Sequence, residues 1–292
     1  MKGRTLFRLV VRVLPEDADA AGRVLVEEGA GGAVQEELPH EARVVCFGES
    51  REVLVPLSLA VKNRLREAGI AATCRVGRAP RAFDAWRTEW TEALAPVKIS
   101  ETLWLVPTSS PAPPCEPGEI VWLEPALAFG FGEHATTRMA ARAVENACAA
   151  GARTMLDFGC GSGVLSLVGA HAGAVRVAGV DADPVAVASA RRNAALNHTA
   201  AKCRFSETRL SRLRAVFDVV VANVDRATLL ERAAELCGRV APGGTLLLTG
   251  FLAEDAPALA RRYRAQGLAV NGRAREGDWV LFSLGASRSR RE

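Results

Sequence analysis

Strand-like and helix-like segments alternate regularly between residues 152 and 266 of this 292-residue chain. Short apolar runs rich in valine and leucine, such as "RTMLDFG" and "FDVVVANV", are followed by stretches with helical spacing. Parallel strands need crossover helices, so the alternation predicts an α/β fold with a mostly parallel sheet and helices on both faces. The last two strand-like segments, 268–276 and 277–285, have no helix between them, which predicts an antiparallel hairpin at one edge of that sheet.

The first 78 residues have a different pattern. A strand-like alternation over 5–13 is followed by a helix-like stretch over 16–29, two further strand-like segments, a second helix over 51–69 and a final strand. Pro56 is expected in the first turns of the second helix, or to delay its start. This βαββαβ order predicts a small ferredoxin-like α+β domain. It carries no catalytic constellation of its own, which favours a role in recognition.

Residues 79–126 join these two patterns and differ from both. Four of the five tryptophans lie here, three of them, Trp86, Trp90 and Trp104, on an amphipathic segment and one expected strand, and a proline-rich loop follows over 111–118. We interpret these tryptophans as packing at a domain junction rather than as substrate contacts. The expected organisation is a domain over 1–78, a linker over 79–126, a domain over 127–286 and a basic tail over 287–292.

Composition excludes several classes of protein. The 37 Lys and Arg residues against 33 Asp and Glu leave a net charge of only +4, so we expect no DNA partner, and the tail "SRSRRE" is interpreted as a solvated end. The seven cysteines form no C-x-x-C pair and the histidines do not cluster, which argues against a disulfide framework and against a metal site. Because no apolar run reaches 18 residues and no signal peptide is evident, we expect a cytoplasmic protein without membrane spans.

The segment "LDFGCGSGV" (156–164) runs from a predicted strand through a glycine-rich turn into a helix. Gly159, Gly161 and Gly163 allow a ligand to approach the backbone, and the helix N-terminus offers free amide groups. The spacing is G-x-G-x-G, with Val164 where a dinucleotide fingerprint has its third glycine. Asp157 suits a cationic amino acid moiety better than a pyrophosphate. The turn therefore favours S-adenosylmethionine over a nicotinamide cofactor, with a purely structural turn as the alternative.

A second acidic residue follows at the end of the next predicted strand. Asp181, in "VAGVDADP", lies about twenty residues beyond the glycine turn, where a carboxylate can accept hydrogen bonds from the ribose hydroxyls of an adenosine. Asp183 is expected to cap the helix that begins at Pro184. The glycine turn and the acidic strand end together predict a cofactor that contains a nucleoside.

The fourth predicted strand of this region ends in "FDVVVANVDR". Ligands of open α/β sheets bind beyond the carboxyl ends of the strands, so Asn223 and Asp225 are expected to face the cofactor. An asparagine there can hold an amine with its lone pair directed at a methyl group. An Asx turn that leaves the strand is the alternative.

One irregular segment, "LAFGFGEHATT" (127–137), fits neither a helix nor a buried strand. Together with "FDAWRTEWTEALAPVKISETLWLVP", "LDFGCGSG", "GVDADP", "FDVVVANV" and "APGGTLLLTGFL", in order behind the ferredoxin-like domain, it resembles the PrmA family of ribosomal protein L11 methyltransferases. The resemblance implies a class I methyltransferase fold, S-adenosylmethionine as the donor, and ribosomal protein L11 as a partner recognised by the N-terminal domain. Lysines and the N-terminal amine of that partner are the implied acceptors, with at most an incidental contact to ribosomal RNA.

The resemblance also implies site residues. The family's cofactor positions correspond to Thr137, Gly159, Asp181 and Asn223, with Asp157 and Gly161 beside them in the turn. The segment 127–137 is then expected to cover the methionine end of the cofactor, with Phe129 and Gly130 in contact with it. Asn223 is the expected orienting residue of catalysis. His134 is expected to position the loop or the substrate, and a hydrogen bond that only braces the loop is its alternative.

The chain departs from the family pattern in the same segment. Phe131 and Ala135 stand where the family has a threonine and a proline or glutamate, and Glu133 stands at a variable polar position. Beyond the fourth strand, Asp225 replaces a small or apolar residue. Phe131 cannot supply a hydroxyl, whereas Glu133 and Asp225 are expected to attract a cationic amine. These changes bear on the protein substrate more than on the cofactor.

The preferred hypothesis is therefore a methyltransferase that modifies lysine or N-terminal amines of ribosomal protein L11. One alternative keeps the donor and changes the acceptor to another protein lysine or to a small amine. A second alternative is a cofactor-binding but inactive module associated with the ribosome. A nicotinamide oxidoreductase is disfavoured by Val164 and Asp157.

Overall fold

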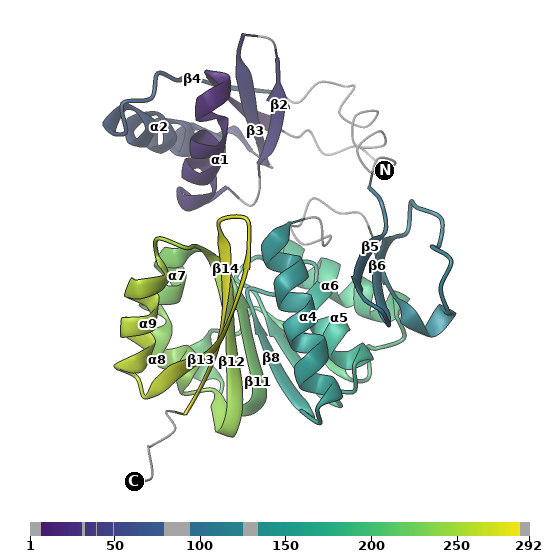
Figure 1. Cartoon of the computed structure of the whole chain (residues 1–292). Helices are drawn as coiled ribbons and strands as arrows, with labels where there is room; N and C mark the ends of the chain where they lie inside the picture. Colours follow the sequence, from purple (N-terminus) through teal and green to yellow (C-terminus); the bar gives the residue numbers. More distant parts are fainter. Residues whose placement is uncertain are drawn as a thin grey trace. The chain divides into compact units, whose positions relative to one another are not determined.

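The computed structural model of the chain describes residues 7–30, 33–38, 40–48, 50–78, 94–124 and 134–286. Contacts between Cα atoms divide the chain into two compact units, residues 1–92 and 93–292. Figure 1 shows both units, each of which is described by itself below.

The first unit is an antiparallel sheet with two helices packed on one face. Its strands pair in the order β2-β3-β1-β4, and alternate residues such as Leu9, Val11 and Val44 bury against the helices. The predicted ferredoxin-like arrangement is confirmed, and Pro56 lies inside the second helix. The elements are β1 (Phe7–Val13), α1 (Ala18–Glu27), β2 (Val34–Glu37), β3 (Ala42–Gly48), α2 (Arg51–Glu67) and β4 (Thr73–Arg78).

The second unit is built on a larger sheet, whose strands pair in the order β10-β9-β8-β11-β12-β14-β13. The first five of these are parallel, and among the described strands of this sheet only β14 runs against them, since it is antiparallel both to β12 and to β13. The predicted class I methyltransferase topology is thereby confirmed. The strands are β8 (Thr154–Phe158), β9 (Arg176–Val180), β10 (Cys203–Ser206), β11 (Phe217–Asn223), β12 (Val240–Leu252), β13 (Leu268–Glu276) and β14 (Trp279–Ala286).

Helices cover both faces of this sheet (Figure 1). One face carries α4 (Ala135–Ala149), α5 (Val164–His171) and α6 (Pro184–Leu196). The opposite face carries α7 (Arg226–Glu231), α8 (Ala233–Cys237) and α9 (Ala256–Arg264), whose apolar residues join those of β11, β12 and β14 in one core. None of the helices that the structure describes is both long and apolar enough to cross a membrane.

Two segments differ from the sequence-based expectation. The stretch expected to form one helix over 226–240 is broken at Arg232 into α7 and α8. Residues 97–123, expected to contribute a single strand, form a separate sheet of β5 (Val97–Ser100), β6 (Leu103–Pro107) and β7 (Ile120–Leu123). These strands have four or five residues each, which is too short for an alternation to stand out in the sequence.

Candidate active site

The carboxyl ends of β8, β9, β11 and β12 lie at the same edge of the large sheet, because these strands are parallel and adjacent. In open α/β sheets this edge is where ligands bind. The glycine turn follows β8, Asp181 follows β9, and Asn223 ends β11. The sequence-predicted positions are thus brought to one edge by the topology of the sheet.

The glycine turn adopts a backbone that other residues rarely take. Gly159, Gly161 and Gly163 have φ angles of 69°, 52° and 83°, which lie in the left-handed region that favours glycine. The Gly159 amide donates to the Val180 carbonyl oxygen at 2.8 Å, which ties the turn to the end of β9. Gly163 is the residue that precedes the first turn of α5. The turn therefore presents backbone amides at the start of that helix.

Asp181 braces the turn from the neighbouring strand. Its Oδ2 accepts a hydrogen bond from the Gly161 amide at 2.8 Å, and its Oδ1 accepts from the Asp183 amide at 3.0 Å. Each carboxylate oxygen has two acceptor positions, so one on each oxygen is left for a ligand. Asp183 caps α6 by accepting from the Val185 amide at 2.8 Å, as predicted.

Asp157 is almost entirely buried beneath the turn, with 1% of its surface exposed. Its Oδ2 accepts hydrogen bonds from the amide and the hydroxyl of Ser166, at 3.0 and 2.7 Å. Burial raises the pKa of Asp157 to about 7, although the Ser166 hydrogen bonds lower it, and the negative charge of Asp181 raises it further. Such a carboxyl changes its charge readily when a cation approaches. Sequence analysis did not single out Ser166, whose only signal is its place in the first turn of the helix.

Asn223 and Thr137 approach each other from segments 86 residues apart. The Asn223 Nδ2 lies 3.5 Å from the Thr137 Oγ1, and Thr137 is fully buried in the first turn of α4. On the other side, Asn223 pairs in register with Thr249 of β12, which is also buried. Both neighbours are fixed, so the Asn223 amide has a defined direction.

The residue after Asn223 is held just as firmly. Val224 fits between Gly159 and Gly250, both of which have positive φ angles. A Cβ atom at Gly159 would overlap the Val224 side chain, and a Cβ atom at Gly250 would overlap its carbonyl group. The chain therefore leaves β11 along a path that only glycine neighbours allow.

His134 is the N-cap of α4. Its Nδ1 accepts from the Thr136 amide at 3.3 Å and lies 2.7 Å from the Thr136 Oγ1. The edge of its ring meets that of Trp279, with ring centroids 4.7 Å apart. Burial lowers the pKa of His134, and the nearby Arg138 charge lowers it further. The structure therefore shows that His134 braces the first turn of α4, while its expected role toward the loop or the substrate stays a prediction.

The β13–β14 hairpin, which carries Trp279, contacts α4 a second time. One turn after His134, Arg138 forms an ion pair with Glu276 of β13, with its Nε 2.9 Å from the Oε1. The first two turns of α4 are thus fastened to the tip of the β13–β14 hairpin at Glu276 and Trp279. Sequence analysis missed both hairpin residues because about 140 positions separate them from α4.

Asp225 has a role other than the one expected. It caps α7, with its Oδ1 accepting from the Thr228 amide at 3.0 Å and its Oδ2 accepting from the Thr228 hydroxyl at 2.6 Å. The spacing Asp-x-x-Thr at the start of a helix was the signal that could have indicated this cap. Each oxygen keeps one further acceptor position, so the expectation that Asp225 attracts a cationic amine stays a prediction.

Six residues named in the sequence analysis lie outside the described part of the chain. They are Phe129, Gly130, Phe131 and Glu133, and the tryptophans Trp86 and Trp90, whose packing at a domain junction stays a prediction. The expected contacts of the first four with cofactor or substrate also stay predictions.

Replacement of His134 by alanine is expected to lower the free energy of unfolding by about 1 kcal/mol, because the N-cap hydrogen bond is lost. The lowered pKa means that the folded state prefers the neutral ring. Full stability is therefore expected above pH 6.5, the usual pKa, with a loss as the pH falls below it. Chemical denaturation between pH 5 and 8 measures both effects. The control is His134→Asn, which can accept the same hydrogen bond; equal losses in both variants would show that the Trp279 contact, not the cap, is what matters.

Comparisons with known proteins agree with one another. Residues 6–286 match the family model described as "Ribosomal protein L11 methyltransferase (PrmA)". A ribosomal protein L11 methyltransferase of Geobacter metallireducens is 38% identical over 240 residues, which cover 81% of this chain and 79% of that protein. One from Ralstonia pickettii is 35% identical over 299 residues, 95% of this chain and 98% of that protein. The crystal structure of a ribosomal protein L11 methylase from Lactobacillus delbrueckii subsp. bulgaricus has a TM-score of 0.61 and 26% identity, over 66% of this chain and 99% of that one.

Proposed function

We propose residue roles for this site from the premise that the chain belongs to the PrmA family of ribosomal protein L11 methyltransferases. As a member, the protein is an S-adenosylmethionine-dependent methyltransferase that acts on ribosomal protein L11. The predicted family, donor and partner are thereby confirmed, and the nicotinamide alternative is set aside. We place the protein in the cytoplasm because its substrate is a component of the ribosome.

The residues at the sheet edge fit the donor. Asp181 has acceptor positions left on both oxygens, which suits the two ribose hydroxyls of an adenosine. Gly159 and Gly161 give the turn its left-handed backbone, and Asp157 provides a carboxyl whose pKa is poised to respond to a cation. When bound, S-adenosylmethionine supplies a methyl group activated by a sulfonium. The chain's own part is to hold that donor and to orient the amine that accepts the methyl group.

Asn223 is the residue that we assign to the acceptor amine. Its Nδ2 faces Thr137, which leaves the carbonyl oxygen to accept an N–H of the incoming amine. If the amine is bound in its neutral form, an N–H held in this way leaves its lone pair for the methyl carbon, which is the alignment that methyl transfer requires. His134 holds the first turn of α4, and thus Thr137, in place. The Asn223–Thr137 approach is the observation that carries this assignment.

The pH dependence of donor binding is expected to report on Asp157. The ammonium group of the donor favours the ionised carboxylate, whose pKa is about 7 in the free protein. If only the ionised form binds, the Kd at pH 6 is expected to be about tenfold higher than at pH 8. Titration calorimetry at pH 7 in buffers of different ionisation enthalpy should also detect a released proton. Asp157→Asn should bind weakly and release none; an unchanged proton release in that variant would assign the titration to another group.

The stability of the free protein is expected to depend on pH in the opposite direction to donor binding. The pKa of Asp157 is raised from its usual 3.8, so the folded state prefers the protonated carboxyl. Its contribution to stability is therefore complete below pH 4 and is lost as the pH rises toward 7. Stability and donor affinity are thus expected to move in opposite directions with pH.

The activity itself is tested on unmodified ribosomal protein L11. The purified protein is incubated with S-adenosylmethionine and L11, and the intact mass of L11 is read for methyl-sized increments. Increments that disappear in Asn223→Ala and Asp181→Ala support the assigned roles. An unchanged L11 mass, with the donor still bound in calorimetry, would contradict them and direct the search to another protein lysine or a small amine.

A further inference from the structure

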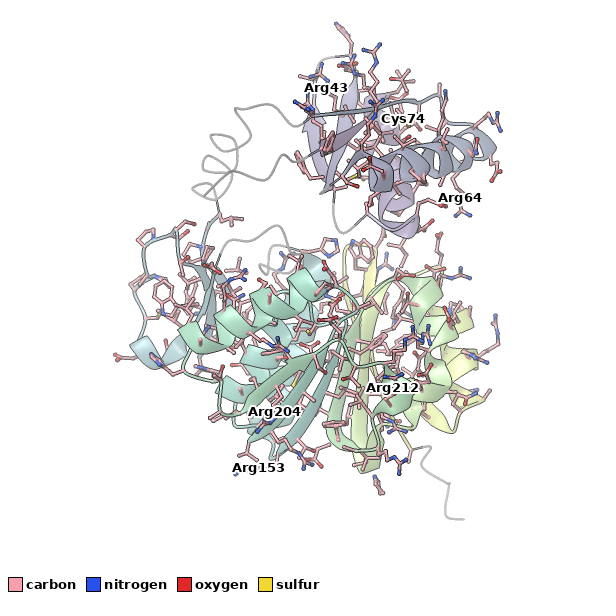
Figure 2. All side chains as sticks on the ribbon, turned by 180° about the vertical axis from the view of Figure 1, so that it is seen from behind. Arg43, Arg64, Cys74, Arg153, Arg204 and Arg212 are labelled. Atoms are coloured by element: carbon pink, nitrogen blue, oxygen red, sulfur yellow. The ribbon has the colours of Figure 1, made fainter. Side chains whose placement is uncertain are left out.

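One face of the N-terminal sheet gathers arginines that are scattered in the sequence. Residues of β1, β3 and β4 alternate between the helix-covered face and the opposite face. The opposite face is hollowed into a cavity of about 290 Å³. We call it the arginine face; its charged lining consists of Arg8, Arg12, Arg43 and Arg75, with Arg78 at the rim, where the register pairs it with Phe7. Figure 2 labels Arg43 on this sheet, and Arg64 on α2 for comparison.

Among the described side chains, one carboxylate compensates the positive charge of this face. Arg12 and Arg43 share one acidic partner, Glu41, at 3.8 and 2.6 Å. Three further guanidinium groups make no ion pair or hydrogen bond with the residues that the structure describes: those of Arg8, Arg75 and Arg78. A single arginine in contact with water needs no acidic partner. Five arginines around one cavity, however, produce a positive potential that attracts an anion.

The shape of the face favours an extended polyanion over a single small anion. Arg8 and Arg12 lie four residues apart on β1, which is about 13 Å along the strand, and Arg43 lies beside Arg12 on the adjacent strand. Between the charges, Val10 and Val45 form an apolar floor, and Phe47 follows on the same face of β3. Charged rims around a flat apolar floor suit a sugar-phosphate backbone with its bases laid on the sheet.

We infer that the arginine face binds single-stranded RNA, mainly through its phosphates. This goes beyond methyl transfer to ribosomal protein L11 and uses no residue of the site at the edge of the large sheet. The low net charge of +4 did not predict it, because the five arginines lie at positions 8 to 78 and only the sheet brings them together. The floor holds one aromatic residue, so little base specificity is expected.

Fluorescence anisotropy of a labelled mixed-sequence RNA 12-mer, titrated with the full protein over a range of salt concentrations, tests this inference. The triple variant Arg8→Gln, Arg75→Gln, Arg78→Gln is expected to bind about tenfold more weakly at low salt, and its slope of log K against log salt should fall by about 2, or about 0.7 for each lost phosphate contact. The matched control is Arg64→Gln, an exposed arginine on α2, which should bind RNA like the native protein.

Two outcomes would overturn the inference. One is RNA binding by the triple variant that equals that of the native protein. The other is a triple variant that loses methylation of L11 in parallel with binding of poly-glutamate, which would assign the face to an acidic protein surface instead. Because RNA binding is measured without the donor or L11, its failure is distinguishable from a failure of the residue roles proposed above.

A buried asparagine of α6 contacts the glycine turn. Asn193 of α6 is fully buried, and both of its amide atoms are used. Its Oδ1 accepts from the Glu124 amide at 2.8 Å, and its Nδ2 donates to the Ser162 carbonyl oxygen at 2.9 Å. Ser162 lies inside the glycine turn, and Glu124 directly follows β7. One side chain therefore ties the turn to the end of another sheet.

Asn197, one helical turn later, provides a built-in comparison. It forms hydrogen bonds with both backbone groups of Trp122, at 2.7 and 2.6 Å, and forms none with the described residues of the glycine turn. Both asparagines thus hold β7 against α6, but only Asn193 reaches the turn. We also infer that Asn193 is a positioning residue for the donor site, an inference that rests on the function proposed above.

Calorimetric measurement of S-adenosylmethionine binding separates this role from general stability. Asn193→Leu is expected to raise the Kd of the donor about tenfold, since the Ser162 carbonyl oxygen loses its buried partner. Asn197→Leu should lower the melting temperature of the protein about as much as Asn193→Leu does. It should leave the Kd of the donor within twofold of the native value. Asn193→Asp keeps the acceptor but loses the donor, and an intermediate Kd is expected. Equal Kd changes in the two leucine variants would reduce Asn193 to a structural role, whether or not L11 is methylated.

Discussion

Replacing Asn223 by alanine is expected to lower kcat for methylation of ribosomal protein L11 by about 100-fold, while the Kd for S-adenosylmethionine changes little. The amide side chain is directed by Thr137 on one side and by the backbone of β12 on the other. Without it, the acceptor amine is bound but no longer aligned, and a misplacement of about 1 Å is enough for a loss of this size. Single-turnover kinetics measured by the mass of L11 report the loss directly.

Thr137→Val is the matched control for that result. Valine preserves the shape of threonine but removes the hydroxyl that faces the Asn223 amide, so a smaller loss of kcat is expected. A kcat within fivefold of native in Asn223→Ala would contradict the orienting role. A large rise in the donor Kd with little change in kcat would instead assign Asn223 to cofactor binding.

Replacing Asp181 by alanine is expected to raise the Kd for S-adenosylmethionine by about 100-fold or more. Hydrogen bonds to a charged group contribute about 1.5–3 kcal/mol each, and this carboxylate is assigned to two ribose hydroxyls. The substitution also removes the acceptor that holds the Gly161 amide, so the glycine turn loses its brace. Both effects weaken binding, and titration calorimetry with the donor measures their sum.

Asp183→Ala is the control that distinguishes loss of a donor contact from loss of a nearby helix cap. Asp183 lies two residues further on and serves as the cap of α6. Its loss is expected to cost about 1 kcal/mol of stability with little change in the donor Kd. If Asp183→Ala weakened donor binding as much as Asp181→Ala, the assignment of the ribose hydroxyls to Asp181 would be wrong.

Much of the fold could be predicted because it follows from local patterns. The strands of the large sheet are buried on both faces and therefore appear as continuous apolar runs, such as the one that became β11. Glycines mark the turns: the positive φ angles at Gly159, Gly161 and Gly163 are the physical reason for the G-x-G-x-G spacing. The candidate site followed from topology, since parallel neighbours bring their carboxyl ends to one edge.

The remaining features depend on contacts between distant residues. The ring contact between His134 and Trp279 joins positions 145 residues apart, and no local sequence pattern predicts it. The capping role of Asp225 was missed because a carboxylate after a strand suggests a ligand site, whereas here both of its oxygens accept hydrogen bonds from Thr228. The arginine face was invisible for the same reason as the hairpin contacts, since its charges come from three strands.

The position of β14 affects the order in which the two units of the protein can fold during synthesis. This late strand lies between β12 and β13, and it buries Val280, Phe282 and Leu284 in the core of the large sheet. Synthesis is vectorial, so that core stays incomplete until residue 286 has left the ribosome. The described strands of the N-terminal sheet all lie between residues 7 and 78. A nascent chain is therefore expected to gain its binding surface well before it gains turnover.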